Sequence, residues 1–344
     1  MRICWLAWLE RSCRIVLILK FMSFRQTTLA LYGDAGRTWL NALPSLLTRY
    51  AQEWDLTLEA PFENLSYNYA APARRADGSD AVIKVGFPND ELRTEIAALR
   101  HFDGPGMVRL LEADEGNCAM LLERIFPGET LWDVDDEQAT ALLLNVMPQL
   151  WKPYLGEYPF PSTVDWARGF ARLRKRYGDG TGSLDRYLVE KAENLFFDLL
   201  ASSEEPVLLH GDLHHDNVLS TYDSARRATT RRSSLITEKT ASSQKHAPRR
   251  IVLAIDPKGV LGEPCYDVGA FLRNPLPALL QKENPRGLMQ RRVDMIVERL
   301  GFDRQRVVGW GFAQAVLSAI WCDEDGVDGA QRTMKVAEIF QSIQ

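Results

Sequence analysis

The sequence contains few cysteines and no paired-cysteine motif. Its five cysteines, at positions 4, 13, 118, 265 and 322, are scattered along the chain without a CxxC pair. Closely spaced cysteines are the usual sign of a zinc site or a disulfide framework, so the pattern indicates neither. Without a disulfide framework, the reducing cytoplasm is the expected location.

Long hydrophobic runs are also missing. Residues 1–24 are apolar and basic, but Glu10, Arg11, Arg14 and Lys20 interrupt the apolar stretch, whereas a membrane span needs about 20 apolar residues. A signal peptide would need a longer apolar stretch and a cleavage site of small residues. We therefore expect no stable membrane association and interpret residues 1–24 as an N-terminal extension. A peripheral membrane or targeting role is the alternative for this segment.

The sequence also lacks an excess of positive charge. The 344 residues include 41 Lys and Arg against 46 Asp and Glu, which gives a formal net charge of -5. Because a nucleic-acid partner requires a large positive field, we expect none and favour a small, neutral or cationic partner. The 46% hydrophobic and 25% charged residues are typical of a globular protein of about two domains.

The order of predicted elements indicates two unequal lobes of an α+β protein. Up to residue 123, short β-type runs and turn residues predict three strands, one helix and two strands, preceded by a helix over 36–54. Beyond Gly128 the periodicity is mostly helical, so we expect a small lobe over 25–123 and a larger one over 124–344. The predicted strands are 56–58, 65–71, 81–85, 108–111 and 118–122. The other predicted helices are 90–102, 137–153, 163–177, 184–201, 288–300 and 307–321.

One segment fits neither lobe. Residues 221–250 hold eight Lys and Arg against two Asp and Glu, are rich in Ser, Thr and Ala, and lack apolar periodicity. Such a composition cannot bury enough surface to fold alone, and it predicts a disordered loop. Because an antiparallel hairpin needs only a short turn, we expect this extra length to leave at the tip of a hairpin.

The residues with the clearest chemistry flank this loop. The apolar run 207–209 leads into the sequence HGDLHHDN at 210–217, and the apolar run 251–255 leads into Asp256. An Asp five residues before an Asn, followed by a strand that ends in Asp, is typical of a phosphotransferase loop. In such a loop Asp212 would accept the proton of the substrate hydroxyl. Asn217 and Asp256 would supply oxygen ligands to Mg²⁺ ions that bridge the phosphates of ATP.

These residues resemble the aminoglycoside phosphotransferase and hydroxyurea-resistance kinase family. The resemblance rests on LLHGDLHHDNVL at 208–219, AIDPKGVLGEPCYDVGAFLRNP at 254–275 and MLLERIFPGETL at 120–131, with weaker support from 24–54 and 318–326. It implies a two-lobed protein-kinase-like fold with a small antiparallel-sheet lobe and a larger, mainly helical lobe. It also implies ATP- and Mg²⁺-dependent phosphorylation of a hydroxyl group on a small-molecule antibiotic. An aminoglycoside is the implied acceptor, with streptomycin as the leading choice.

The resemblance also implies how the small lobe would hold the nucleotide. Lys84, at the end of AVIKV, would bind the phosphates, and Glu95 would orient it, in preference to Glu91. Ser66 and backbone amides of the loop 64–68 would cover the phosphates. The backbone from Glu123 to Ile125 would meet the adenine base.

Two features depart from the pattern of protein kinases. The loop 64–68 has no GxGxxG, so glycines cannot supply its grip on phosphate. Asp256 is followed by Pro-Lys-Gly instead of Phe-Gly. Switching through that phenylalanine therefore cannot be assumed.

The acidic segment near the end of the chain is a candidate for contact with the acceptor. Streptomycin carries guanidinium groups, which pair well with carboxylates. We therefore assign Trp321, Glu324 and Asp325 to the acceptor site. An ordinary helix end is the alternative interpretation.

Three histidines and one further aspartate in the motifs have two interpretations each. His210, His214 and His215 are alternatively a metal cluster, but we expect His210 to brace the loop by hydrogen bonds. Asp267 is expected to bond backbone groups around the catalytic loop rather than a metal ion.

Two other functions stay open at this point. The first is a kinase for another hydroxyl compound, such as hydroxyurea or a metabolite. The second is a nucleotide-binding protein that does not catalyse, because the basic loop separates Asn217 from Asp256. The acceptor hydroxyl and the oligomeric state are not predicted.

Overall fold

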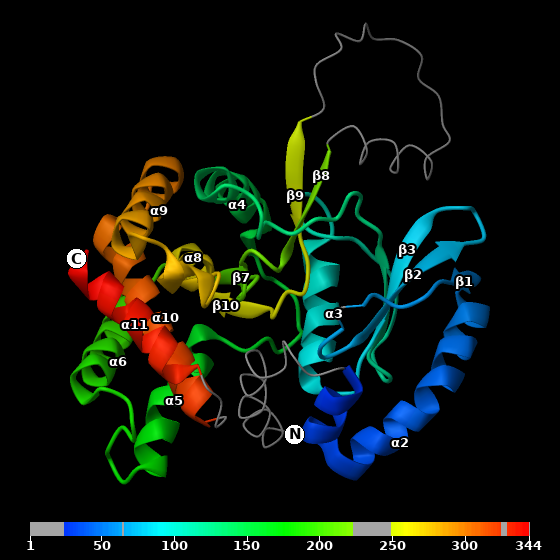
Figure 1. The fold of residues 1–344 in the computed structure, drawn as a ribbon, viewed down its shortest axis with the longest axis horizontal. Helices are drawn as coiled ribbons and strands as arrows, with labels where there is room; N and C mark the ends of the chain where they lie inside the picture. Colours follow the sequence, from blue (N-terminus) through cyan, green and yellow to red (C-terminus); the bar gives the residue numbers. More distant parts are fainter. Residues whose placement is uncertain (1–23, 64, 223–248, 325–328, 344) are drawn as a thin grey trace, which may run out of the picture.

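In the computed structural model, a lobe built on a β-sheet lies beside a lobe built on helices (Figure 1). The structure describes residues 24–63, 65–222, 249–324 and 329–343. The predicted extension up to residue 23, most of the predicted basic loop and Asp325 lie outside the described residues. Among the described residues, no helix is both long enough and apolar enough to cross a membrane.

The first lobe consists of an antiparallel sheet and two helices. The strands are β1 (Leu56–Leu58), β2 (Tyr69–Arg75), β3 (Asp80–Val85), β4 (Leu110–Asp114) and β5 (Ala119–Glu123), in the order β1-β2-β3-β5-β4. Helix α2 (Phe24–Glu53) precedes them, and α3 (Asp90–Phe102) joins β3 to β4. This order confirms the prediction of three strands, a helix and two strands.

Both faces of the sheet are buried. The face to which each side chain points can therefore be identified from the core in which it packs. Successive side chains of a strand point to opposite faces. In β5, Leu121 packs in the core shared with α2, whereas Met120 and Leu122 pack in the core shared with α3 and the second lobe. In β3, Ile83 and Val85 belong to the α2 side. Lys84, between them, therefore points toward α3.

Helix α2 is longer than the prediction of 36–54. It begins at Phe24, but Gly33 has non-helical angles (φ 53°, ψ -128°), so two helical segments meet at a kink. Pro44 lies inside the second segment without ending it. Trp39, Leu40 and Leu43 are buried against the sheet, and this packing outweighs the unfavourable proline.

Two predicted strands are displaced along the chain. The prediction of 65–71 becomes β2 at Tyr69–Arg75, and the prediction of 108–111 becomes β4 at Leu110–Asp114. β2 continues through Pro72, although proline lacks the N–H that a strand ladder uses. In the structure Pro72 pairs with Val82, and its carbonyl accepts a hydrogen bond from the Glu59 N–H.

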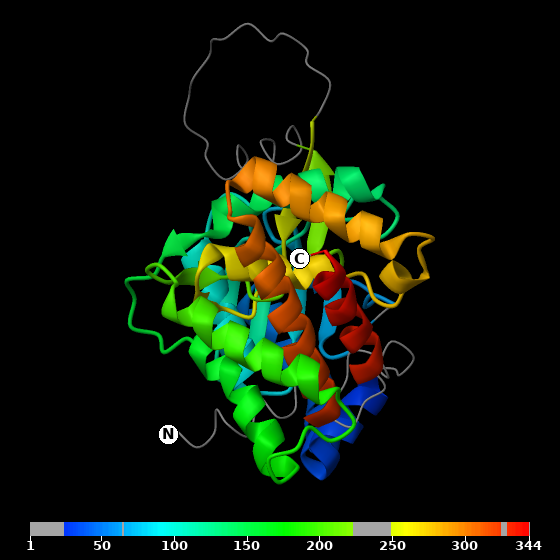
Figure 2. The ribbon, with the colours of Figure 1, turned by 90° about the vertical axis from the view of Figure 1, so that its left-hand side faces the viewer.

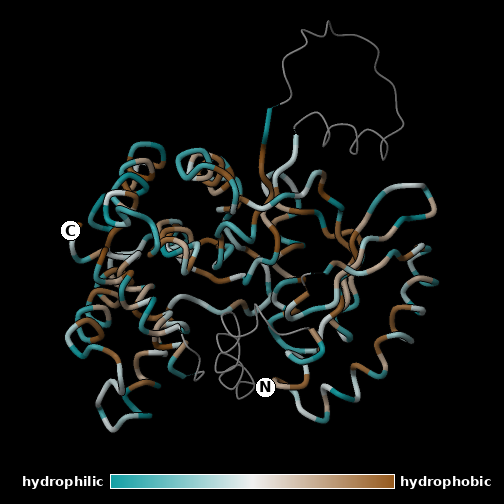
Figure 3. Tube along the Cα trace, viewed as in Figure 1, coloured by the Kyte–Doolittle hydropathy of each residue, from teal (hydrophilic) through white to brown (hydrophobic). Residues whose placement is uncertain are grey.

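The second lobe is a set of helices around one central helix (Figure 2). Helix α10 (Arg304–Glu324) has fourteen buried residues among its 21, as expected of a helix surrounded by others. Apolar stretches of the chain gather where these helices meet (Figure 3). The other helices are α4 (Asp136–Leu150), α5 (Thr163–Arg176), α6 (Arg186–Ala201), α8 (Pro264–Arg273), α9 (Pro285–Leu300) and α11 (Ala330–Ser342).

Two of these helices were not predicted from the sequence. Helix α8 has only ten residues, which is shorter than the window of about 11–18 residues over which helical periodicity is recognised. In α11, the spacing of Met334, Ala337 and Phe340 on a buried face was a usable signal. The short elements β6 (Lys152–Pro153), β7 (Val207–Leu209), β10 (Val260–Gly262) and η2 (Ala278–Gln281) were also missed.

A two-stranded hairpin carries the chain from one motif to the other. Strands β8 (Val218–Tyr222) and β9 (Arg250–Ala254) pair antiparallel, from Val218 with Ala254 to Tyr222 with Arg250. Residues 221, 222 and 250, which were predicted as loop, therefore belong to strands. The last strand pair, Tyr222 with Arg250, lies at the end of the hairpin that is far from Asn217 and Asp256.

We predict that the connection can be shortened without loss of the fold. Opposite Cα atoms of an antiparallel pair are about 5 Å apart, so a two-residue turn can join Tyr222 to Arg250. Closure entropy changes by only about 0.6 kcal/mol per doubling of loop length. Replacing Asp223 to Pro248 with a short Gly-containing turn should leave Tm and kinase activity near those of the parent. Loss of activity in a variant that still unfolds cooperatively would contradict this.

Candidate active site

The loop between β7 and β8 is braced from beneath by a buried histidine. His210 is fully buried, and its Nε2 donates to the carbonyl of Ile255 (2.9 Å) while its Nδ1 accepts from the backbone N–H of Asp212 (3.2 Å). Burial lowers the pKa of His210, so the neutral ring with one donor and one acceptor fits both bonds. The expectation that His210 braces the loop is confirmed.

A buried aspartate completes this support. Asp267, on α8, accepts from the backbone N–H groups of Gly211 (2.8 Å) and His210 (3.3 Å) and from Nε1 of Trp151 (3.2 Å). This confirms its predicted structural role. Gly211 has φ +82°, and a Cβ there would come within 3.0 Å of the Trp166 ring. A larger residue at position 211 would therefore distort the loop just before Asp212.

The predicted base, Asp212, is held on both carboxylate oxygens. Oδ1 lies 3.4 Å from Nη2 of Arg273, and Oδ2 lies 3.6 Å from Nε2 of His214. Burial alone would raise the pKa of Asp212, but His214 and Arg273 oppose it and the balance lies below the ordinary value. The carboxylate is therefore ionised across the physiological pH range, as an acceptor of protons must be.

Arg273 was missed by sequence reasoning. It lies at the end of α8, and its Nη1 also donates to Oε1 of Gln314 on α10 (3.3 Å). The only signal was its place within FLRNP, one of the segments that carried the family resemblance. Arg273 and Asp212 are 61 positions apart in the sequence. No local sequence pattern could therefore pair them.

The β8–β9 register brings the two predicted metal ligands together. The backbone N–H of Ile255 donates to the carbonyl of Asn217 (2.9 Å), directly beyond the last strand pair. Nδ2 of Asn217 donates to the backbone carbonyl of Asp212 (2.8 Å). The amide oxygen of Asn217 therefore points away from this carbonyl. The Asp256 carboxylate is 46% exposed.

The carboxylate of Asp256 and the amide oxygen of Asn217 fit a magnesium ion whose other ligands are water and phosphate oxygens. Among the described residues, no three His, Cys, Asp or Glu side chains form a closed metal cluster. One carboxylate and one amide oxygen are instead a typical protein contribution to Mg²⁺, which keeps water and phosphate oxygens in its shell. Asp256 and Asn217 would be its protein ligands.

A buried lysine connects the sheet, α3 and Asp256. Nζ of Lys84 lies 2.7 and 2.9 Å from the two carboxylate oxygens of Glu95 and 3.1 Å from Oδ1 of Asp256. Burial favours the neutral amine, but Asp256 and Glu95 together raise the pKa of Lys84 above its ordinary value. Glu91, the partner given lower preference, instead forms an ion pair with Lys258.

The remaining nucleotide residues lie along the sheet and the passage between the lobes. The side chain of Glu123 is occupied by Arg109, through Nε (2.9 Å) and the backbone N–H (3.1 Å), so only its backbone is suited to contact a base. Ile125 lies two residues further along the chain and packs against the main core. Ser66 is half-buried in the β1–β2 connection. Their roles stay predictions.

The predicted acceptor residues form an aromatic and ionic group at the end of α10. Trp321 meets Trp166 edge to face (5.6 Å between centroids), and Trp166 also borders Gly211. Glu324, however, forms a bidentate ion pair with Arg172 of α5 (2.9 and 3.1 Å) and is 8% exposed. This pairing gives Glu324 a structural partner that the sequence did not predict, and Asp325 lies outside the described residues.

The three histidines of the motif have three separate environments. His210 bonds to Ile255, and His214 lies near Asp212 and Asp216. His215 stacks on Phe271 (5.2 Å), and burial, together with the charges of Arg292 and His214, lowers its pKa to about 2. The rings do not converge on one point as ligands of a single ion would.

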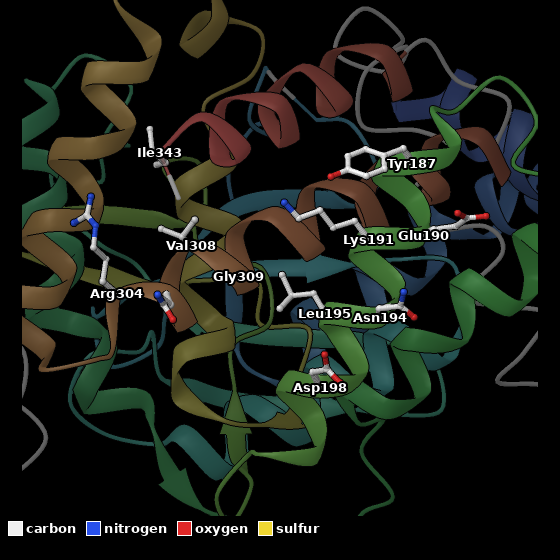
Figure 4. Close-up of a pocket in the computed structure, with 11 residues that line it drawn as sticks. Tyr187, Glu190, Lys191, Asn194, Leu195, Asp198, Arg304, Val308, Gly309 and Ile343 are labelled. Atoms are coloured by element: carbon white, nitrogen blue, oxygen red, sulfur yellow. The ribbon is translucent and has the colours of Figure 1, made fainter.

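One cavity lined by described residues lies away from this site. It has a volume of about 700 Å³ and lies between α6 and the first turns of α10, with Lys191, Leu195 and Val308 on its walls (Figure 4). Val308 and Trp321 are separated by about 20 Å along α10. The cavity is therefore distinct from the predicted acceptor residues.

Comparison with known proteins agrees with this geometry. Residues 66–326 match the model of the aminoglycoside/hydroxyurea antibiotic resistance kinase family. The chain belongs to this family. Streptomycin 6-kinase of Streptomyces glaucescens is 28% identical over 86% of this chain and 88% of its own length. Hydroxyurea phosphotransferase of Kitasatospora aureofaciens is 29% identical over 97% and 88%.

A solved structure confirms the expected fold. Choline kinase LicA from Streptococcus pneumoniae superposes with a TM-score of 0.54 at 12% identity, covering 88% of this chain and 99% of its own. The two-lobed protein-kinase-like fold is thereby confirmed. As a member of the resistance kinase family, the protein is a phosphotransferase that acts on an alcohol group of a small molecule.

The Arg172–Glu324 pair yields a prediction about stability. Removing one partner of a buried ion pair leaves an uncompensated charge. Glu324→Gln should therefore lower the free energy of unfolding by about 2–4 kcal/mol, measured by urea denaturation. The matched control is Glu190→Gln, because Glu190 pairs with Arg186 on an exposed surface and should cost less than about 1 kcal/mol. A raised KM for the acceptor with unchanged stability would instead make Glu324 a substrate ligand.

Proposed function

We propose that the protein transfers the γ-phosphoryl group of ATP to a hydroxyl group of streptomycin, with Mg²⁺, and so inactivates the antibiotic in the cytoplasm. The observation that carries this proposal is the convergence of Lys84, Asp256, Asn217 and Asp212. They come from a sheet strand, a hairpin and a loop, and they supply a phosphate ligand, two metal ligands and a base. The basic insertion leaves this set intact, which argues against a protein that only binds nucleotide.

Each of these residues has a defined task in the reaction. Asn217 and Asp256 would hold magnesium, which would reduce the negative charge of the phosphates when bound. Lys84 adds a fixed positive charge from the sheet, and Glu95 holds its ammonium in place. Asp212 orients the acceptor hydroxyl and takes its proton, while Asn217 fixes the loop through the backbone carbonyl of Asp212. Positioning and charge stabilisation are the main contributions in phosphoryl transfer.

Two acceptors have specific support. The streptomycin 6-kinase relative supports an aminoglycoside, and the net charge of -5 suits a cationic substrate. The hydroxyurea phosphotransferase relative is equally similar and spans more of this chain. Hydroxyurea is therefore the second candidate.

The chemistry can be tested on the predicted base. Asp212→Asn keeps the size of the side chain but removes its ability to accept a proton. We expect kcat to fall by about 10²–10⁴-fold, the range for loss of a general base, with little change in the affinity for Mg²⁺–ATP. Turnover at the parent rate would remove Asp212 from this role.

The acceptor can be decided by a panel assay. ATP consumption should be measured with streptomycin, other aminoglycosides, hydroxyurea and simple sugars, with Asp212→Asn as the background control. We expect streptomycin to give the highest kcat/KM, and mass spectrometry should find one added phosphate. Turnover of hydroxyurea alone would select the second candidate, and nucleotide binding without any turnover would support a non-catalytic protein.

A further inference from the structure

The segment after the metal aspartate holds α3 in place. Lys258, two residues after Asp256, forms an ion pair with Glu91 in the first turn of α3. The backbone N–H groups of Lys258 and Gly259 both donate to the carbonyl of His210 (2.8 and 3.3 Å). Lys258 therefore joins the catalytic loop through its backbone and α3 through its side chain.

Gly259 makes the second contact with the helix. It has φ +64°, and a Cβ there would lie 3.0 Å from Cβ of Ala98 on α3 and 2.9 Å from the Phe160 ring. This close approach requires glycine. The Pro-Lys-Gly segment thus contacts α3 both by an ion pair and by direct packing.

The contacted residues of α3 form one stripe. Residues at i, i+4 and i+7 lie on the same face of a helix, and Glu91, Glu95 and Ala98 have this spacing. Lys258 holds the first, Lys84 the second and Gly259 the third. Two of the three contacts come from the segment that also carries Asp256.

We propose that Lys258 is a positioning residue that fixes α3 through Glu91, so that the Lys84–Glu95 pair and Asp256 are in register before the nucleotide binds. The ion pair takes the place of a Phe-Gly contact, which this chain lacks. Because the Lys258 and Glu91 side chains are 36% and 24% exposed, the pair adds little to overall stability. Its effect is on the position of Glu95, one helical turn from Glu91. The inference rests on the proposed function only in taking Mg²⁺–ATP as the ligand.

Reversing the charges of Lys258 and Glu91 tests whether their ion pair positions α3 for nucleotide binding or only adds to stability. The variants are Lys258→Met, Lys258→Arg, Glu91→Lys, and Lys258→Glu combined with Glu91→Lys. The control is Arg93→Met, because Arg93 pairs with Asp90 within α3, and its side chain is 38% exposed. Calorimetry measures the Kd of Mg²⁺–AMP-PNP, and hydrogen exchange measures the protection of α3 amides in the full-length protein without nucleotide.

The expected pattern is specific. Lys258→Met should raise the Kd by about 3- to 10-fold and speed exchange in α3, with Tm nearly unchanged. Lys258→Arg and the double reversal should restore the parent values to within about twofold, whereas Glu91→Lys alone should not. Arg93→Met should leave the Kd unchanged.

Three results would overturn the proposal. Unchanged Kd and exchange in Lys258→Met would show that the pair does not position α3. Failure of the double reversal to restore binding would show that Lys258 acts on the nucleotide directly. If the parent does not bind AMP-PNP, the proposed function fails; the exchange measurement still decides the role of Lys258, and unchanged α3 protection in Lys258→Met would then overturn it.

Discussion

The architecture of the site depends on neutralising one buried ammonium group. Lys84 is 6% exposed, and a buried cation is tolerated only when it is paired and hydrogen-bonded. One partner, Glu95, comes from α3, and the other, Asp256, comes from the end of β9 in the second lobe. Burial of Lys84 therefore requires the sheet, the helix and the hairpin to meet. A metal ion that binds Asp256 would use a carboxylate that is already directed to this point.

The loop 210–217 is positioned by hydrogen bonds to its backbone, in addition to the packing of Leu213 and His215 in the second lobe. His210 and Asp267 bond to the backbone of residues 210–212 and 255, and Asn217 bonds to the backbone carbonyl of Asp212. These hydrogen bonds hold the backbone of the loop in one position. The backbone position in turn determines where the side chain of Asp212 points. Trp166 closes the other side by contact with Gly211.

Residues of the site that are close in sequence could be predicted from the sequence, whereas pairs of residues that are far apart in sequence could not. The spacing of Asp212, Asn217 and Asp256 was visible because a loop and two short strands separate them. The Lys84–Glu95 pair was implied by the family resemblance, which assigns the two residues to a strand and the next helix. Lys258 and Glu91 are 167 residues apart, and Arg172 and Glu324 are 152 apart, so only the fold reveals them. Helix α8 was missed because its ten residues are fewer than the window of about 11–18 residues over which helical periodicity is recognised.

The separation of reaction chemistry from acceptor recognition follows from the same layout. The groups proposed for phosphoryl transfer lie on β3, the catalytic loop and the β8–β9 hairpin, which are tied to each other by the bonds described above. The described residues proposed for the acceptor, Trp321 and Glu324, lie at the end of α10, and Trp321 reaches Gly211 through Trp166 of α5. Substituting Trp321 would remove none of the bonds to Asp212 described above. If the proposed function holds, the preference between an aminoglycoside and hydroxyurea should therefore be sought around Trp321 on α10, apart from the groups proposed for phosphoryl transfer.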